Sequence, residues 1–323
     1  MNNKTDVMHN QKIAIGVSAC LLGAKVRFDG GHKHNRYIEG LLGEHFSFVS
    51  YCPEVAIGMT IPRDPIRLVN TDGEIRVVAS RDPDVDYSKQ LTRYGNEVAG
   101  AIQHLRGFIF KKDSPSCGIE RVKVYTENGY PKRNGTGFFA NEIMKQNPLL
   151  PVEEEGRLND HVLRENFVNR VYVYDRWMEL VKSGVSKSRL IDFHTRHKYL
   201  LLAHNQQVYR ELGRKLSSLE RVDVDEFAQE YILAVMTTLK QKANRKTHVN
   251  VLQHLLGFLR SCLDGDDRAE ILNAIKAYGK GEYPLIVPIT LLRHHFRRNP
   301  HPFVSQQIYL APHPDELMLR NNI

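Results

Sequence analysis

Three of the four cysteines in this 323-residue chain each follow a short apolar run. Cys20 and Cys52 follow their runs directly, whereas Cys117 comes after a short loop. The three runs cover residues 12–19, 46–51 and 107–111. The carboxyl ends of parallel strands lie along one edge of a sheet, and ligands bind in the crevice there. We therefore expect the three thiols to converge.

Three thiolates that lie close together could have more than one role. A structural zinc ion needs a fourth ligand, which His32 or His34 could supply, although the chain has no closely spaced cysteine pair. An iron–sulfur cluster held by three cysteines leaves one iron open as a Lewis acid for a soft atom such as sulfur. Simple packing is a third interpretation, because free cysteine is among the most buried residue types. Packing is the preferred interpretation for Cys262, which lies in an amphipathic stretch.

The elements that must position these cysteines alternate along the chain. Between the second and third runs, residues 87–105 carry apolar side chains at helical spacing. A strand, a helix and a strand joined by a crossover of this length predict parallel strands. Residues 67–78 contain a turn at Thr71–Gly73 between apolar stretches, which predicts a hairpin. The first part of the chain is therefore expected to be an α/β domain with a parallel sheet.

The second half has a helical rhythm. Residues 147–160 carry two prolines, a glycine and an acidic run, so we predict one domain over residues 1–160 and another over 161–323. Apolar side chains at steps of three and four predict one long helix over 186–216. Further helices are predicted at 225–239, 247–262, 269–278 and 289–296. No alternating β-branched run follows Val173, so the second domain is expected to be all-α.

The composition is that of a globular protein, with 41% hydrophobic and 25% charged residues. No apolar run reaches the roughly 20 residues that a membrane helix needs, and the first twelve residues lack the apolar core of a secretory signal. Few cysteines and no disulfide framework fit a reducing compartment, so a cytoplasmic protein is expected. The net charge of +8 favours an anionic partner, with nucleic acid first, and no membrane or protein partner is indicated.

Four short motifs carry a resemblance to a known family. They are Val17–Gly23, Arg27–Gly30, Cys52–Glu54 with Gly58 and Pro62–Arg63, and Ser114–Gly118. In this order they resemble the thiouracil desulfidase family TudS, and the resemblance covers about residues 10–160. Residues from about 165 to 310 resemble the YbgA-like helical domain. The combination of the two resembles bacterial desulfidases that remove sulfur from 4-thiouridine in tRNA.

The resemblance implies a specific cofactor and reaction. A [4Fe-4S] cluster would be held by Cys20, Cys52 and Cys117, and its fourth iron would bind the sulfur of the substrate. The thiocarbonyl would become a carbonyl by hydrolysis, with release of sulfide and no redox change. Glu54 would activate the water, and Ser114 matches the active-site serine of the family. A helix-start role is the alternative for Glu54, and turn chemistry is the alternative for Ser114.

Two further residues are candidates for substrate binding. Asp29 could orient the base through its N–H groups, and a turn before two glycines is the equal alternative. Ser116 lies beside Cys117 and could hydrogen-bond the base. Residues 135–139 resemble a loop whose Phe138 and Phe139 could stack on a base, although core packing is preferred for both.

A tRNA partner would need a broad basic surface, because Lys and Arg contacts to phosphates supply affinity without sequence preference. Between residues 182 and 215 the chain has eight Lys or Arg residues and two Asp or Glu residues. The RNA-binding candidates in this stretch are Arg189, Arg196, Lys198, Arg214 and Lys215. A solvated helix face is the alternative for any single one. Further basic clusters lie at 240–246 and 293–298.

Three functions remain open on these grounds. The leading hypothesis is a tRNA 4-thiouridine desulfidase with a catalytic [4Fe-4S] cluster. A desulfidase of free thiouracil-type bases is the second, and an RNA-binding protein with a structural or sensing metal site is the third. His194, His197 and His204 lie close on the predicted long helix, and hydrogen-bonded or RNA-facing roles are preferred to a metal site. The chain has no Walker or dinucleotide-binding glycine motif and no tight cysteine triplet of radical SAM enzymes.

Overall fold

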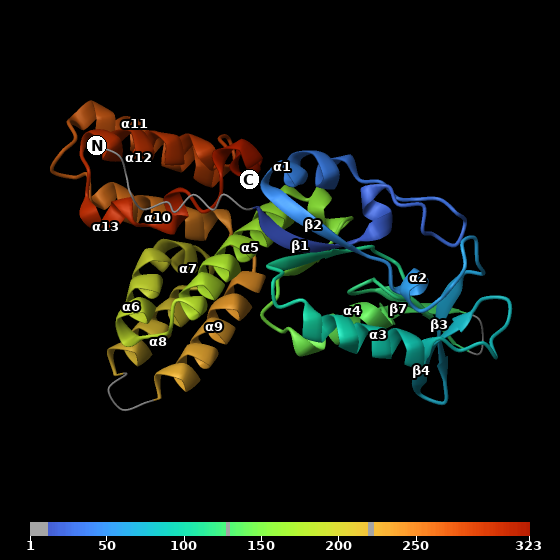
Figure 1. Ribbon diagram of the computed structural model, residues 1–323. Helices are drawn as coiled ribbons and strands as arrows, with labels where there is room; N and C mark the ends of the chain where they lie inside the picture. The colour runs from blue at the N-terminus through green and yellow to red at the C-terminus, as the bar shows by residue number, and fades with distance from the viewer. Residues whose placement is uncertain (1–11, 127–129, 219–222) are drawn as a thin grey trace. The chain divides into compact units, whose positions relative to one another are not determined.

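The computed structural model describes residues 12–126, 130–218 and 223–323. The polar N-terminal stretch that we examined for a secretory signal lies almost wholly outside them. Contacts within the chain divide it into two units, Met1–Asn159 and Asp160–Ile323, which are described separately (Figure 1). Among the described residues, the structure has no helix with the length and apolar character needed to cross a membrane.

The first unit is built on a four-stranded parallel sheet, which confirms the predicted fold class. Its strands lie in the order β2, β1, β5, β8, and each neighbouring pair runs parallel. The strands are β1 (Ile13–Ser18), β2 (Phe46–Tyr51), β5 (Gly107–Phe110) and β8 (Val152–Glu154). The first three coincide with the three apolar runs, and the inner strands β1 and β5 are the more buried and more continuously apolar, as expected for a parallel sheet.

Two helices pack together against one face of this sheet. They are α3 (Ser88–Ala101) and α4 (Phe138–Gln146), and Figure 1 shows them side by side below β1 and β2. Phe139 at the start of α4 is fully buried and lies edge-on to Phe108 and Phe110 of β5. Short helical segments, a π-turn (Ile38–Leu42) and α1 (Gly43–His45), precede β2. The helix predicted over 87–105 is therefore confirmed, and Phe139 is core.

A second sheet was only half predicted. Its order is β4, β3, β6, β7, with strands β3 (Ile66–Thr71), β4 (Glu74–Ala79), β6 (Val122–Tyr125) and β7 (Pro131–Gly135). The hairpin of β3 and β4 is confirmed, and its turn places Asp72 and Gly73 at positive φ. β6 is only four residues long and β7 is polar, so neither was recognised, and β8 lies inside the acidic segment that we assigned to the domain boundary.

The second unit consists of helices, as predicted. Its α-helices are α5 (His161–Lys182), α6 (Lys187–Arg196), α7 (Lys198–His204), α8 (Gln206–Ser217), α9 (Val224–Lys240), α10 (Arg245–Gly257), α11 (Gly265–Lys280), α12 (Ile286–Arg298) and α13 (Pro302–Ser305). Short 3-10 turns follow at Ile308–Leu310, Asp315–Leu317 and Leu319–Asn321. One core cluster joins α7, α10, α11 and α12 through residues such as Leu252, Ile271 and Leu292.

The prediction of one long helix over 186–216 is wrong. The stretch forms α6, α7 and α8, with breaks at His197 and Asn205. Asn205 has an extended backbone, and its side chain accepts hydrogen bonds from the amides of Gln207 and Val208. Asparagine competes for backbone donors in this way and starts a new helix, while the apolar spacing continues across the break.

Candidate active site

The three cysteines lie at adjacent strand ends of the parallel sheet. Cys20 is in a 3-10 turn (Ala19–Leu22) directly after β1, and Cys52 precedes α2 (Pro53–Ala56) directly after β2. Cys117 lies in the loop after β5. All three line one cavity of about 610 Å³. The structure thus brings together side chains that are separated by 32 and 65 positions in the sequence.

The start of α4 holds the Cys117 loop in place. The amides of Gly137, Phe138 and Ala140 donate to the carbonyls of Gly118 (2.7 Å), Pro115 (3.1 Å) and Ser116 (3.1 Å). A Cβ atom on Gly137 would lie 2.5 Å from the carbonyl carbon and oxygen of Ser116 and 2.7 Å from the amide nitrogen of Cys117. Only glycine therefore allows helix and loop to approach this closely.

Burial keeps the three free thiols protonated. It raises the pKa of Cys20 to about 11, against the opposing effect of Lys111 and Arg27, and it also raises the pKa values of Cys52 and Cys117. A buried thiol is a poor nucleophile, whereas a bound metal displaces its proton. The surroundings therefore suit metal ligation better than nucleophilic attack by sulfur.

The donor set fits a cluster better than a single ion. Within residues 12–126, 130–218 and 223–323, no three His, Cys, Asp or Glu side chains are close enough together to hold one metal ion. His34 is paired with Glu39 instead, and His32 accepts the amide of His34. A cluster binds its cysteines through separate irons, so its ligands stand farther apart than the ligands of one ion. Three cysteines around one cavity, two of them buried and Cys52 partly exposed, match that requirement.

Glu54 lies in the first turn of α2 and lines the same cavity. Its Oε1 accepts a hydrogen bond from Ser116 Oγ at 2.7 Å. Its Oε2 accepts one from Arg63 Nε at 3.1 Å and forms an ion pair with the guanidinium. The carboxylate is therefore held in one orientation while it faces the cavity.

Arg63 is a residue of the site to which the sequence assigned no role. Its side chain is almost fully buried, and it also donates to the backbone carbonyls of Val26 (2.8 Å) and Thr60 (3.2 Å). These contacts fix the guanidinium independently of Glu54. The Pro62–Arg63 dipeptide was part of the family motif, but its distance from Glu54 along the chain gave no sign of the pair.

The two serines occupy different positions. Ser114 lines the cavity, and its Oγ accepts from the amides of Ser116 (3.3 Å) and Cys117 (3.1 Å). Ser116 is fully buried, so its hydroxyl reaches Glu54 and Cys117 Sγ (3.7 Å) rather than open space. The two hydroxyls are 3.0 Å apart. Ser114 is thus placed to meet a substrate, and Ser116 is placed behind Glu54.

Asp29 has the geometry of a turn residue. Its side chain is half exposed, and Oδ1 accepts from the amide of Gly31 at 3.0 Å. That hydrogen bond lowers the pKa of the carboxyl group. The described residues that line the cavity include its neighbours Arg27 and Phe28 but not Asp29 itself.

Two buried carboxylates, Glu154 at the end of β8 and Glu155 directly after it, were missed in the acidic run. Glu155 forms an ion pair with Lys111 and accepts the amide of Lys112 at 2.7 Å. Glu154 accepts the amide of Ile119 at 2.9 Å, and burial raises the pKa of its carboxyl group. These carboxylates tie the loop of Cys117 to the edge of the sheet, so the acidic run is structural and not a solvated linker.

The basic candidates of the helical unit have mixed surroundings. Arg189 donates to the carbonyls of Ser183 and Gly184 at the end of α5. Arg196 is 3.9 Å from Asp192, and Lys215 is 3.7 Å from Glu230. Lys198 lies over the rings of Tyr199 (5.2 Å) and Phe303 (5.1 Å), and Arg214 is exposed.

The three histidines that the sequence placed on one predicted helix are hydrogen-bonded. His194 contacts the hydroxyl of Tyr231 at 3.2 Å, and His197 contacts the carbonyl of Phe193 at 2.7 Å. His204 contacts the carbonyl of Gln241 at 2.6 Å. Burial lowers the pKa of all three, to about 4 for His194 and about 3 for His197. Cys262 is exposed after the end of α10, which contradicts the packing role that we assigned to it.

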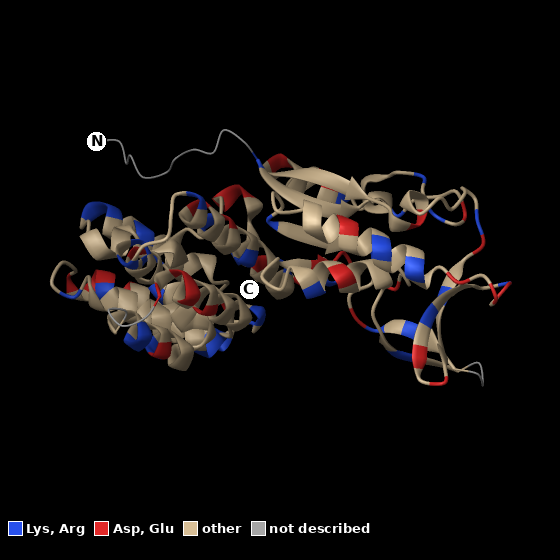
Figure 2. Ribbon diagram, turned by 60° about the horizontal axis from the view of Figure 1, so that its bottom comes forward, with Lys and Arg blue, Asp and Glu red and all other residues tan. Residues whose placement is uncertain are grey.

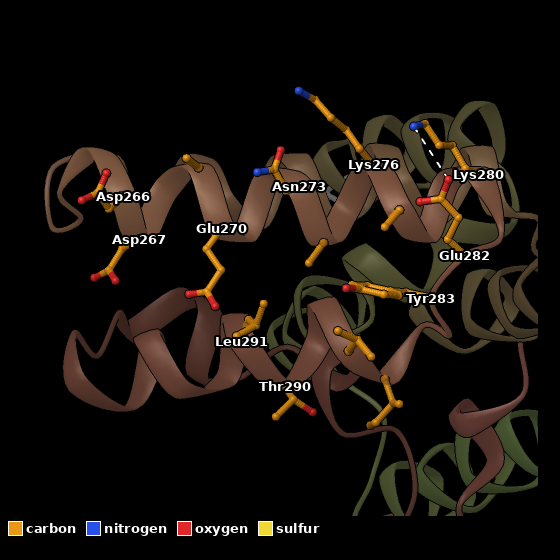
Figure 3. A pocket seen from close by; sticks show the side chains of 15 residues that line it. Asp266, Asp267, Glu270, Asn273, Lys276, Lys280, Glu282, Tyr283, Thr290 and Leu291 are labelled. Atoms are coloured by element: carbon orange, nitrogen blue, oxygen red, sulfur yellow. Dashed lines mark ion pairs between the residues drawn. The ribbon is translucent and has the colours of Figure 1, made fainter.

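A larger and more open cavity of about 1190 Å³ lies between α11 and α12 (Figure 3). Asp266, Asp267 and Glu270 are gathered at one end, and Lys276 and Lys280 lie toward the other. No cysteine or histidine lines it among the residues that the structure describes. Size alone therefore does not locate the chemistry, and the cysteine-lined cavity is the candidate active site.

Comparison with known proteins agrees with this placement. Residues 15–155 match the family model of 2-thiouracil desulfurase, and residues 198–314 match a family described as a protein of unknown function (DUF1722). The chain is 30% identical over 154 residues to the uncharacterized protein YbgA of Escherichia coli (strain K12), covering 47% of this chain and 91% of that protein. It is 30% identical over 156 residues to the uncharacterized protein YbbK of Bacillus subtilis (strain 168), covering 45% and 97%.

One solved structure is also similar, a [4Fe-4S]-dependent thiouracil desulfidase TudS, at 30% sequence identity and a TM-score of 0.36. The match covers 46% of this chain and 94% of that one. The fold and the site define a class of protein. In this class, three cysteines and a carboxylate surround one cavity of a parallel α/β unit, and a helical unit follows in the chain. The chain belongs to the 2-thiouracil desulfurase family, to which its residues 15–155 are matched.

Proposed function

We propose that this protein removes sulfur from 4-thiouridine in tRNA by hydrolysis, converting the thiocarbonyl to a carbonyl and releasing sulfide. The observation that carries the proposal is the cavity of the first unit, where Cys20, Cys52 and Cys117 meet Glu54. The three cysteines would hold a [4Fe-4S] cluster. When bound, such a cluster supplies a soft Lewis acid that draws electrons from a thiocarbonyl.

The residues of the chain would perform the proton chemistry. Glu54 is held by Ser116 and Arg63, so its carboxylate is oriented to take a proton from a water in the cavity. Ser114 lines the cavity beside Cys117, where its hydroxyl can hydrogen-bond the base. Arg63 and Ser116 act through Glu54, and we therefore regard them as positioning residues.

The tRNA substrate is supported by charge. The chain has a net charge of +8, and Lys or Arg residues are spread over the helical unit (Figure 2). Arg189, Arg196, Lys198, Arg214 and Lys215 would contact phosphates there, and Arg189, Arg214 and Lys215 are exposed. A free base needs no such surface, so the same charge argues against the alternative of a free thiouracil desulfidase.

The decisive experiment compares two substrates. The full chain is purified without oxygen, its iron content and absorbance are recorded, and it is incubated with 4-thiouridine-containing tRNA and with free 4-thiouracil. Loss of the thiocarbonyl absorbance of the tRNA, with sulfide released in equal amount, is the expected result. Turnover of 4-thiouracil alone would establish the free-base alternative. Iron bound without turnover of either substrate would favour a structural or sensing metal site.

A further inference from the structure

The second sheet of the first unit has one apolar face and one basic face. Residues that are paired across strands point to the same side of a sheet. Leu68 pairs with Val77 and Val124, and all three are buried. The opposite side, which we call the outer face, carries basic residues and Tyr125 together with a buried valine and one acidic residue. Its members are Arg67, Val69 and Thr71 of β3, Glu74, Arg76 and Val78 of β4, Lys123 and Tyr125 of β6, and Arg133 of β7.

All of these outer-face residues except Val78, which is buried, are partly or fully exposed. Figure 2 shows Lys and Arg segments along the strands of this sheet. Arg76 is 3.8 Å from Asp86 and Arg133 is 3.1 Å from Asp113. Arg67 and Lys123 form no ion pair within the described parts of the chain, so their charges are available to an anion.

The centre of the outer face is aromatic. The guanidinium of Arg67 lies 5.5 Å from the centre of the Tyr125 ring, and Arg67 Nε is buried without a hydrogen-bond partner among the described residues. Stacked arginine and tyrosine planes are the surfaces on which unpaired bases stack in RNA-binding proteins. Cations and an aromatic ring on one face suit a chain of alternating phosphates and bases.

The outer face is continuous with the candidate active site. Arg67, Lys123 and Tyr125 also line the cysteine-bearing cavity. The cavity wall carries further cations at Arg27, Lys33 and Lys112. A base that reaches a buried reaction centre must leave its stack, and the nucleotides beside it must then run along the adjoining surface.

We propose that the outer face of the second sheet binds the single-stranded RNA nucleotides next to the one in the cavity, with Lys123 and Arg67 on phosphates and Tyr125 beneath a base. The inference rests on the proposed function and adds to it a contact surface within the cysteine-bearing unit. The helical unit is then not the sole source of RNA affinity.

The test measures binding of the full chain to a short single-stranded RNA that contains uridine, so that no turnover occurs. Lys123→Gln should weaken binding and reduce the slope of log affinity against log salt by about 0.7, the value for one phosphate contact on a single strand. Tyr125→Ala should weaken binding roughly five- to a hundredfold, while Tyr125→Phe keeps the affinity because it keeps the ring.

Lys132→Gln is the matched control. Lys132 lies on the same hairpin and is exposed, but it pairs with Val124 and therefore belongs to the opposite side. The Lys132→Gln substitution removes the same charge as Lys123→Gln, but it should leave both the RNA affinity and the slope of log affinity against log salt unchanged. Equal losses of affinity for Lys123→Gln and Lys132→Gln would show that only the net charge matters. That result would overturn the assignment of RNA binding to the outer face.

Wild-type affinity and slope in both Lys123→Gln and Tyr125→Ala would also overturn it. Turnover of free 4-thiouracil by the wild-type chain separates this failure from failure of the proposed chemistry. If the chain desulfurises the free base yet does not bind this RNA, the desulfidase reaction is supported and the outer-face proposal is refuted.

Discussion

The carboxylate of Glu54 is held by two different partners, and this arrangement determines what it can do. Ser116 Oγ donates to one oxygen, and the Arg63 guanidinium pairs with the other. Both partners are buried and have further contacts of their own, so neither is free to turn away. The remaining lone pairs of the carboxylate face the cavity, where they can accept a proton from water.

Replacement of Glu54 by glutamine should therefore separate chemistry from cofactor binding. An amide cannot accept the proton, and the loss of a general base costs roughly a hundredfold or more in turnover. The three cysteines are untouched, so iron content and visible absorbance should equal those of the wild type. Steady-state turnover of 4-thiouracil and iron analysis on the same preparation test both expectations.

Glu39→Gln provides the comparison for this substitution. Glu39 is an exposed carboxylate paired with His34 outside the cavity, so its loss should leave turnover within about twofold of the wild type. A Glu54→Gln protein with full iron and full activity would remove Glu54 from the reaction.

Among single residues, the sequence identified those that directly follow apolar runs. It missed those that loops place in the active site. Cys20 and Cys52 could be placed because strand ends in a parallel sheet share one edge. Arg63 could not, because its contact with Glu54 depends on the path of the loop between α2 and β3. Ser114 was preferred to Ser116 as the active-site serine, and the structure shows that Ser116, the proposed substrate-binding residue, is buried.

At the scale of elements, the contact between α4 and the Cys117 loop is a very close approach of backbone to backbone. Gly137→Ala would place a Cβ atom 2.5 Å from backbone atoms of Ser116, and backbone cannot yield as a flexible side chain can. We expect the loop to shift, a loss of about 1–3 kcal/mol in stability and reduced iron incorporation. Thermal unfolding and iron analysis measure the two effects.

Gly100→Ala is a suitable comparison. Gly100 lies in α3, and a Cβ atom there would meet nothing within 4 Å. Alanine should raise stability by up to about 1 kcal/mol, because it favours the helix over glycine. Equal behaviour of the two variants would mean that the loop tolerates the displacement.

Two of the strands that escaped prediction, β7 and β8, have polar residues in ordered positions. β7 is a charged edge strand, and β8 ends in carboxylates that are satisfied by the amides of Ile119 and Lys112. The local sequence pattern cannot distinguish such a strand from a linker, because the hydrogen-bond partners of its polar residues come from loops that are distant in the sequence. The break at Asn205 was missed for the opposite reason, since the apolar spacing continues through it.

For the helical unit as a whole, buried neutral histidines predict sensitivity to acid. Burial lowers the pKa of His194 to about 4 and of His197 to about 3, whereas histidine in an unfolded chain titrates near 6.5. The unfolded state therefore binds protons first as the pH falls, and stability is lost below about pH 6.5. At pH 5 the loss should be about 2 kcal/mol for each of the two.

Tryptophan fluorescence measures this loss selectively. The chain has one tryptophan, Trp177, which packs edge-on to Phe193 at 5.5 Å, and Phe193 stacks on His197 at 4.0 Å. The urea midpoint of its fluorescence should fall between pH 7 and pH 5, and a His197→Asn variant should show a smaller fall. Equal midpoints at both pH values would show that these histidines do not control the acid response.

At the scale of the molecule, the two units divide the proposed work between them. The cysteines, Glu54 and both serines lie in Met1–Asn159, whereas the densest basic stretch of the sequence lies in Asp160–Ile323. A chain that ends at Asn159 should therefore still incorporate iron and desulfurise a small thiobase. Its affinity for tRNA should fall, because the phosphate contacts of the helical unit are gone.

The size of that fall distinguishes two arrangements of RNA contacts. If the helical unit supplied all of them, the shortened chain would bind tRNA no better than a neutral protein does. If the outer face of the second sheet also binds RNA, the shortened chain should keep part of its affinity for tRNA. Lys123→Gln should reduce this remaining affinity, and Lys132→Gln should not. A salt titration of the full chain, the shortened chain and the two lysine variants measures these contributions, since each lost phosphate contact lowers the slope. A shortened chain with the full slope would instead exclude the helical unit from RNA binding.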